Sequence, residues 1–263
     1  MMRLKTEREI EIMKESSLIV GKTLAEVAKL ISPGVCTKTL DKVAETYIRD
    51  NGATPSFKGY NGFPATLCLS VNEVVVHGIP GRYELKDGDI ISVDCGAKKN
   101  GFHADYAYTF CVGNVSEEVR NLCDRTKKSL YLGIEQAKVG NKTGDIGFAI
   151  QSYVESYGYS VVREMTGHGI GRNIHEKPDV LNYGQKGNGY KIKKGMVFCI
   201  EPMINLGVKE IRIDKDGWTA RTQDGLPSAH YEHMVAIREN GTEIVSTYVY
   251  IDEVLNRKEI KLS

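Results

Sequence analysis

The amino-acid sequence predicts an α+β fold whose two halves resemble each other and surround antiparallel strands. Two stretches with helical periodicity open the chain, strand-like segments follow them, and a similar order recurs in the second half. A two-residue turn joins the longest strand-like segments and makes them antiparallel neighbours. No stretch rich in proline, glycine or serine separates the halves, so residues 1–263 are expected to form a single domain.

A long helix is expected near the start of the chain. Thr6 and Glu9 have the spacing of a capping box, in which each side chain accepts a hydrogen bond from the other residue's backbone N–H. Ser32-Pro33-Gly34 ends this helix, because proline and glycine rarely continue one. The residues of its inward face recur at steps of three and four and are Ile10, Met13, Ser17, Val20, Leu24, Val27 and Ile31.

A second helix is expected to follow at once. Thr37 would cap it, and Asn51-Gly52 would close it. Its inward face would carry Leu40, Val43, Ala44, Tyr47 and Ile48.

The two halves of the chain share a weak internal repeat. The first copy consists of Gly34, Thr37, Leu40, Tyr47, Ile48 and Gly52, and the second, in the same order, of Gly140, Thr143, Ile146, Tyr153, Val154 and Gly158. Both copies precede strand-like sequence, and Ser116 with Glu117 and Glu118 starts a long helix in the second half. Two halves related in this way would place a functional site at their junction.

A hairpin is expected after the first two helices. Residues 90–94 and 102–112 are strand-like, and Asn100-Gly101 between them is a strong signal of a two-residue turn. That turn sets Lys99 opposite Phe102 and fixes the pairing of every residue behind them.

The hairpin register brings two aspartates to one face of the sheet. Asp94 would lie opposite Ala107 and Asp105 opposite Gly96, roughly 7–8 Å apart as diagonal neighbours. Gly96 has no side chain and would leave room for an ion between them. An isolated pair of this kind is more often two solvated aspartates. Asp94, however, lies in an apolar strand, and a buried carboxylate without a partner is costly, which strengthens the case for a metal.

Two glutamates and two histidines complete the candidate site. Glu201 ends the apolar run 197–201, and Glu232 heads another strand-like segment. The run Met165-Thr-Gly-His168-Gly-Ile-Gly-Arg-Asn-Ile-His175 offers one metal ligand and a second, catalytic imidazole. Four carboxylates neutralise two divalent ions. Oxygen ligands with one imidazole suit manganese, iron or cobalt at least as well as zinc, and such a pair of ions is typical of hydrolases.

These motifs resemble those of the methionine aminopeptidases, specifically the type I enzymes of bacteria, over essentially the whole chain. The resemblance rests on the order of Asp94, Asp105, His168, Glu201 and Glu232, and on the motifs Asn72-Glu-Val-Val-Val-His77-Gly-Ile-Pro80, Thr166-Gly-His168-Gly-Ile-Gly and Ile200-Glu201-Pro202-Met203. It implies the pita-bread fold, an α+β architecture with two pseudo-twofold-related halves around a central antiparallel sheet. It also implies removal of the initiator methionine from nascent proteins and peptides whose second residue is small.

The resemblance assigns roles to the metal-site residues. It implies that Asp105 and Glu232 bridge two divalent ions (cobalt, manganese, iron or zinc), that Asp94 chelates one, and that His168 and Glu201 complete the other. Glu201 would also accept a proton from the hydroxide or water that bridges the ions and attacks the peptide bond.

The resemblance also implies the substrate-binding residues. His175 would hydrogen-bond the scissile carbonyl or its oxyanion, and His77 would contact the scissile amide. The methionine side chain would occupy an apolar slot formed by Phe57, Tyr60, Phe63, Cys68 and Trp218. Asn72, Val74 and Ser228 match a site for a monovalent cation, sodium or potassium, in the family.

Two other functions fit the same fold. A proline-specific (Xaa-Pro) aminopeptidase or prolidase would carry an extra N-terminal domain, for which the early start of the site motifs leaves no room. A non-catalytic pita-bread protein that binds peptide, RNA or chromatin would lose metal ligands, whereas all five predicted ligands are present.

Composition restricts the partners and the compartment. A formal net charge of +1 argues against a dedicated nucleic-acid site. No segment is apolar enough for a membrane span or a secretion signal. Six scattered cysteines without a C-x-x-C pair indicate reduced thiols in the cytoplasm. We expect a monomer that meets nascent polypeptides, and contact with the ribosome would follow from that substrate.

Overall fold

The computed structural model describes residues 2–262 of the chain. The first half holds α1 (Glu7–Leu30), α2 (Thr37–Asp50), β1 (Thr54–Pro55), the short 3-10 helix η1 (Tyr60–Gly62), β2 (Leu67–Val71), β3 (Val74–Val76), β4 (Ile90–Lys99) and β5 (Phe102–Cys111). The second half begins with α3 (Glu117–Gln136), α4 (Thr143–Glu155), β6 (Ser160–Val161), β7 (Gly167–Gly169), β8 (Glu176–Val180) and β9 (Val197–Ile200). It continues with β10 (Met203–Asn205), β11 (Ile211–Ile213), β12 (Ala220–Thr222), β13 (Ser228–His230), β14 (His233–Arg238), β15 (Gly241–Ile244) and α5 (Val249–Leu262).

The capping box of α1 is confirmed. The Glu9 backbone N–H donates to Thr6 Oγ1 at 3.2 Å, and the Thr6 backbone N–H donates to Glu9 Oε2 at 3.0 Å. Every residue predicted for the inward face of α1 is buried, from Ile10 to Ile31. The helix ends before the predicted Ser-Pro-Gly stop.

Thr37 does not cap α2, and that expectation was wrong. The N-cap is Cys36, and Thr37 is the first helical residue. The Thr37 hydroxyl instead accepts a hydrogen bond from the Gly81 backbone N–H at 3.0 Å, because the loop around Gly81 runs beside the start of the helix. Of the predicted inward face, Leu40, Ala44 and Ile48 are buried, whereas Val43 and Tyr47 are half-buried.

The two copies of the repeat adopt the same local structure. Thr37 and Thr143 are the first residues of α2 and α4. The glycines before these helices, Gly34 and Gly140, have φ values of 88° and 98°, and Gly52 and Gly158 after them have 69° and 83°. Residues with side chains rarely adopt these left-handed conformations, so the repeated glycines mark the ends of equivalent helices.

The β4–β5 hairpin has the predicted register. Lys99 lies opposite Phe102, Asp94 opposite Ala107 and Asp105 opposite Gly96. On its other side β4 pairs with β2, which sets Cys68 beside Asp94. The second half contains a five-stranded sheet with the strand order β15-β14-β9-β7-β8, and neighbouring strands in it are antiparallel.

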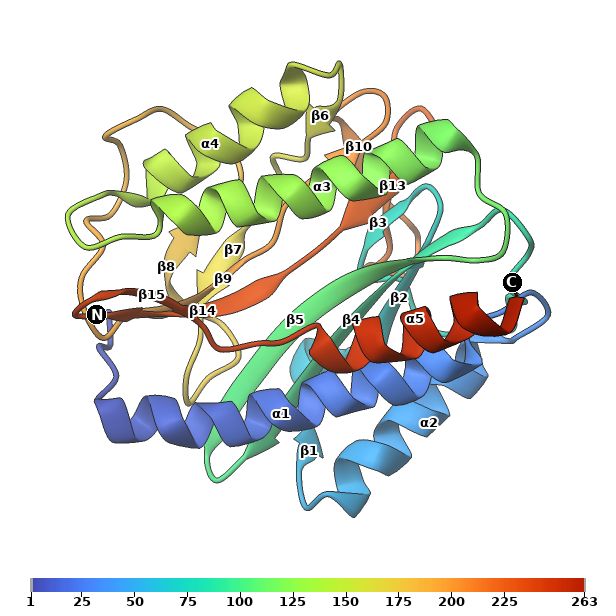
Figure 1. Cartoon of the computed structure of the whole chain (residues 1–263), viewed down its shortest axis with the longest axis horizontal. Helices are drawn as coiled ribbons and strands as arrows, with labels where there is room; N and C mark the ends of the chain where they lie inside the picture. Colours follow the sequence, from blue (N-terminus) through green and yellow to red (C-terminus); the bar gives the residue numbers. More distant parts are fainter. Residues whose placement is uncertain (1, 263) are drawn as a thin grey trace.

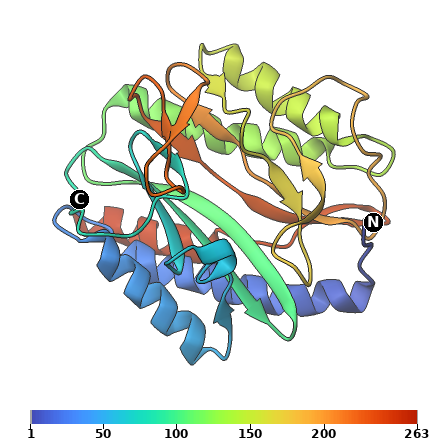
Figure 2. The ribbon, with the colours of Figure 1, turned by 180° about the vertical axis from the view of Figure 1, so that it is seen from behind.

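The helices lie on one side of the strands. Figure 1 shows α1, α2 and α5 over the half that contains β4 and β5, and α3 and α4 over the other half. Viewed from behind, in Figure 2, the strands and their connecting loops stand in front of the helices. Buried residues of α1, β4, β9 and β14 belong to the same hydrophobic core, which holds the halves together. None of the helices within residues 2–262 is long and apolar enough to cross a membrane.

Candidate metal centre

Residues from both halves meet where the β4–β5 hairpin approaches β9 and β14. Asp94 and Asp105 come from the hairpin, while Glu201 directly follows β9 and Glu232 directly precedes β14. The Glu232 backbone N–H donates to the Ala107 carbonyl at 3.1 Å, and Ala107 is the residue opposite Asp94. This hydrogen bond brings the second half against the hairpin, so the four carboxylates form one group, which we call the carboxylate cluster.

The carboxylate cluster is short of partners. Oδ1 of Asp94, Oδ1 of Asp105, Oε1 of Glu201 and Oε1 of Glu232 are buried and have no hydrogen-bond partner among the residues that the structure describes. Oxygens of Asp94, Asp105 and Glu232 lie within 4.8 Å of one another. Buried carboxylates of this kind are costly unless cations pair with them, so the donor set fits divalent metal ions.

Burial also explains the electrostatics of the cluster. It raises the pKa of Asp94 to about 7 and holds the pKa values of Asp105, Glu201 and Glu232 well above their ordinary range. The negative charge of neighbouring carboxylates adds to the effect for Asp105, Glu201 and Glu232. Two divalent cations would remove both causes, because they replace water as the partner of each charge and cancel the repulsion.

His168, on β7, turns its Nε2 toward the cluster. Its Nε2 lies 3.5 Å from Glu201 Oε1 and 3.9 Å from Asp105 Oδ2. Its Nδ1 lies 3.0 Å from the Gly169 carbonyl, to which an Nδ1–H would donate. Burial lowers the pKa of His168 to about 3, so the ring is neutral and Nε2 keeps its lone pair for a metal.

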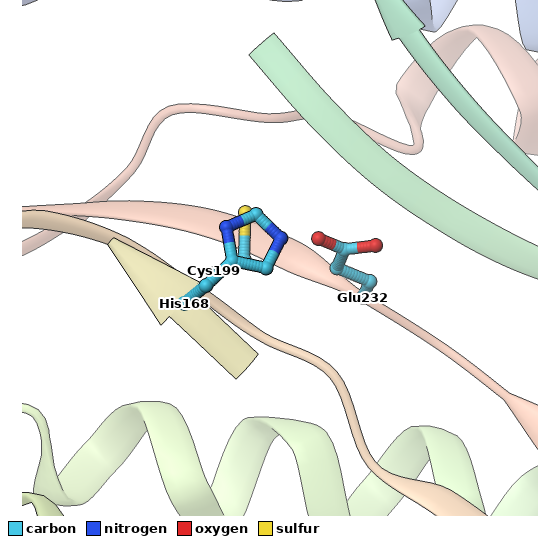
Figure 3. Close-up of side chains that lie close together, drawn as sticks. All are labelled: His168, Cys199 and Glu232. Carbon is cyan, nitrogen blue, oxygen red and sulfur yellow. The ribbon is translucent and has the colours of Figure 1, made fainter. Parts of the chain in front are cut away.

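Cys199 lies behind His168. Figure 3 shows the His168 ring and the Glu232 carboxylate facing each other, with the Cys199 sulfur beside the ring. The thiol donates to the Asp105 carbonyl at 3.6 Å, and burial raises its pKa well above the usual range. The Cys199 side chain is therefore a neutral thiol, and it holds the Asp105 backbone through this hydrogen bond. Nothing in the sequence places Cys199 at the site, since a cysteine within an apolar strand is as readily a core residue.

A cavity of about 370 Å³ opens beside the cluster. Its wall includes all the residues predicted for the methionine slot, which are Phe57, Tyr60, Phe63, Cys68 and Trp218. The Phe63 and Trp218 rings meet edge to face with centroids 5.2 Å apart. Met203 and His230 also line the cavity and were missed. The signal for His230 was its two-residue spacing from Glu232, which puts both on one side of an extended chain.

The two predicted substrate-contacting histidines lie on the same cavity. His175 Nδ1 is 3.0 Å from the Tyr60 hydroxyl, and the His175 ring meets the His168 ring edge to face at 4.3 Å. His77 has a positive φ of 58° and turns its ring toward Trp218, 6.4 Å between centroids. Both imidazoles are thus beside the carboxylate cluster and next to the apolar wall.

The sequence led us to expect that Gly96 leaves room for an ion. It instead leaves room for the wall of the cavity. A Cβ at Gly96 would lie 2.9 Å from both Phe57 Cε1 and Ser56 Cβ. The Phe57 ring therefore occupies the space that the missing side chain leaves.

Asn72, Val74 and Ser228 lie together away from the carboxylate cluster. The Ser228 backbone N–H donates to the Asn72 carbonyl at 2.9 Å, and the Ile90 N–H donates to Asn72 Oδ1 at 3.0 Å. Asn72 and Val74 line a separate cavity of about 260 Å³. A monovalent cation at these residues stays a prediction.

Comparison with known proteins gives a consistent result. The model of metallopeptidase family M24 matches residues 11–239. The chain is 53% identical to a methionine aminopeptidase of Clostridium perfringens over 94% of its own length and 99% of that protein, and 50% identical to methionine aminopeptidase 1 of Bacillus subtilis over 92% and 98%. The crystal structure of methionine aminopeptidase from Rickettsia prowazekii is 40% identical, with a TM-score of 0.93 over 94% of this chain and 100% of that one.

Proposed function

Because this chain belongs to metallopeptidase family M24, we propose that its carboxylate cluster and His168 hold two divalent metal ions at the centre where N-terminal methionine is removed. The protein is a metalloaminopeptidase with the pita-bread fold, and the similarity to methionine aminopeptidases does not favour a proline-specific enzyme or a non-catalytic binder. We further propose that residues 1–263 work as one catalytic domain, which the core shared by both halves supports.

One observation carries the proposal. Four buried carboxylate oxygens that lack a hydrogen-bond partner among residues 2–262 lie beside a neutral imidazole on the wall of a largely apolar cavity. In the proposed arrangement the two ions would be held by Asp94, Asp105, Glu201, Glu232 and His168, with Asp105 and Glu232 shared between them. When bound, two divalent ions would polarise the scissile carbonyl and make a water molecule nucleophilic at neutral pH.

The protein's own side chains hold the proton and the substrate. Glu201 is at once a proposed ligand and the group that would accept a proton from the attacking water. His175 lies within reach of the cavity and would donate a hydrogen bond to the carbonyl oxygen as negative charge develops there. Tyr60 would orient this ring through Nδ1. His77, on the wall of the same cavity, would contact the scissile amide.

The cavity wall supports selection of methionine. Its apolar and aromatic residues, with the thiol of Cys68, suit an unbranched thioether. We propose that the free α-amino group binds near Asp94, which restricts the enzyme to chain ends. A small second residue is expected, because a large one would crowd the cavity rim.

Metal identity, cation site and cellular context belong to the same proposal. The two ions would be cobalt, manganese, iron or zinc, and sodium or potassium would bind at Asn72, Val74 and Ser228. The six free cysteines support a reducing compartment such as the cytoplasm. There the protein would act as a monomer on nascent chains, with contact to the ribosome.

The test is cleavage of Met-Ala-Ser, Met-Leu-Ser and Ala-Pro-Ser peptides by chelator-stripped protein, with and without added Mn(II) or Co(II). We expect metal-dependent release of methionine from Met-Ala-Ser alone. Release from Ala-Pro-Ser would move the activity to the proline-specific relatives. Metal binding without any cleavage would support a non-catalytic binder.

A further inference from the structure

His230 is a third imidazole at the carboxylate cluster. It ends β13, and its side chain is 2% exposed. The segment is held firmly, because the His230 backbone N–H donates to Thr109 Oγ1 at 3.0 Å while the Thr109 hydroxyl donates to the His230 carbonyl at 2.7 Å. Thr109 belongs to β5, the strand that carries Asp105. The His230 backbone is therefore held against the hairpin that carries Asp94 and Asp105.

The free nitrogen of His230 points between two glutamates. Its Nε2 lies 3.8 Å from Glu201 Oε2 and 3.9 Å from Glu232 Oε2. In the part of the chain that the structure describes, this buried nitrogen has no hydrogen-bond partner. Both distances are too long for a hydrogen bond. Two donor atoms that each lie about 2.1 Å from the same ion can be up to roughly 4.2 Å apart. Both distances from His230 Nε2 are shorter than this limit.

Glu201 consequently lies between two imidazoles. His168 Nε2 approaches Glu201 Oε1 at 3.5 Å, and His230 Nε2 approaches Glu201 Oε2. Neither ring pairs with the carboxylate directly, and donor atoms of Glu201, His230 and Glu232 all fall within 4.8 Å of one another. A cation between them would satisfy the nitrogen and both carboxylates.

We infer that His230 is an additional ligand of the ion shared by Glu201 and Glu232, so that this ion is bound by two imidazoles. The inference rests on the proposed metal centre. Charge supports it, because four carboxylates already neutralise two divalent ions, and a further ligand must then be neutral. An imidazole meets that condition, whereas a fifth carboxylate would leave excess negative charge in a buried site.

A second imidazole changes which metals the centre prefers. Nitrogen donors strengthen the binding of cobalt and zinc more than that of manganese, for which oxygen ligands suffice. The chain should therefore bind Co(II) and Zn(II) more selectively over Mn(II) than a centre with His168 alone.

Metal affinity of the metal-free full chain tests the inference directly. Competition with a chromophoric chelator gives the Kd of Co(II) and of Mn(II) for wild-type protein, His230→Gln and His233→Gln. His233 is the matched control, since it is equally buried and neighbours Glu232, but its Nδ1 bonds Ser246 Oγ at 2.6 Å. For His230→Gln we expect the Co(II) Kd to rise by roughly 10-fold or more, the Mn(II) Kd to rise less, and the Co(II) absorption spectrum to change. Equal Kd values and spectra in His230→Gln and wild type would overturn the inference.

A measurement on wild-type protein avoids dependence on the folding of a variant. In the proton NMR spectrum of the Co(II)-loaded chain, each metal-bound histidine contributes one strongly shifted, exchangeable ring N–H. Two such signals are expected, from His168 and His230, and a single signal would contradict the second imidazole.

Failure of the inference can be told apart from failure of the proposed function. His168→Ala should lose Co(II) binding at one site whatever His230 does. If His168→Ala loses Co(II) binding and His230→Gln does not, the proposed metal centre is supported and His230 is not one of its ligands. Wild-type protein that binds no Co(II) at all would remove both.

Discussion

A buried carboxylate is stable in a folded protein only when something compensates its charge, and this chain gathers four of them. Asp105 and Glu232 are almost completely buried, and each has an oxygen without a partner within the described residues. Ordinary surface acids would have turned outward. The residues of this cluster are thus explained by the ions they are proposed to hold rather than by the stability of the empty fold.

Glu201→Gln tests the proposed double role of this residue as metal ligand and proton acceptor. The amide keeps the shape but loses the charge and the proton-accepting oxygen, so kcat on Met-Ala-Ser should fall at least roughly 100-fold. Steady-state kinetics at saturating metal, with bound metal measured in parallel, separates loss of an ion from loss of the proton path. A kcat close to that of wild type would contradict both roles.

His175→Ala should act on turnover more than on substrate binding. If the imidazole donates to developing negative charge, kcat should fall roughly 100- to 1000-fold while KM changes little. Tyr60→Phe is the related variant, because it removes only the hydroxyl that holds His175 Nδ1 at 3.0 Å, and it should cause a smaller loss of kcat. An effect on KM alone would exclude the proposed hydrogen bond to the reacting oxygen.

Cys111 provides a residue-scale prediction away from the metal centre. A hydrogen bond from the Cys123 thiol, helped by Arg120, lowers the pKa of Cys111 to about 7. In native protein its alkylation by iodoacetamide should therefore rise through a midpoint near pH 7, as followed by peptide mass spectrometry.

The donor at position 123 can be removed or kept. Cys123→Ser retains an O–H donor and should leave the Cys111 midpoint low, whereas Cys123→Ala should move it upward toward the usual value of about 8.5. A wild-type midpoint already at that value would show that the hydrogen bond has no effect on Cys111.

At the scale of elements, local signals predicted local structure. The Thr6–Glu9 capping box and the Asn100-Gly101 turn each involve residues close in sequence, and both formed as expected. Thr37 was misplaced because its hydroxyl found a partner in Gly81, far along the chain. Contacts of that kind are decided by how the elements pack, which the sequence alone does not display.

Gly96→Ala tests how β4 shapes the methionine slot. The added Cβ would lie 2.9 Å from Phe57 Cε1 and must push that ring into the cavity. We expect kcat/KM on Met-Ala-Ser to fall roughly 10-fold, mainly through a higher KM. A loss of this size is typical of one misplaced methyl group in an apolar pocket. Co(II) affinity should not change, because the carboxylates keep their places.

A second substitution provides the control for Gly96→Ala. In the double variant Gly96→Ala/Phe57→Leu the smaller side chain yields the space that the methyl group needs, so the two effects should not add. Strict additivity of the two single effects would mean that Gly96 influences binding by another route.

At the scale of the whole molecule, the site exists only because two halves meet. The order of Asp94, Asp105, His168, Glu201 and Glu232 allowed the cluster to be predicted, since each residue lies in a strand or directly beside one. His230, Cys199 and Met203 were missed. Their approach depends on pairings between distant strands, such as Met203 opposite His230 across β10 and β13. Only the assembled sheet reveals these neighbours.

The proposed binding of cations at the junction of the two halves gives the last prediction. Without metal, the negative charges of four buried carboxylates from the two halves repel one another, and this repulsion opposes their packing. The unfolded chain has no assembled site, so ions bind the folded state almost exclusively. Co(II) at 100 times its Kd should then stabilise the fold by about 2.7 kcal/mol for each site that it fills. For a chain of this size that corresponds to a rise in Tm of roughly 5–10 °C over chelator-stripped protein, measurable by differential scanning calorimetry.

His168→Ala should show a smaller rise in Tm, because one site loses a ligand. Equal Tm values for stripped and loaded wild-type protein would mean that the carboxylates are compensated by something other than a metal, and the two-ion centre would have to be abandoned.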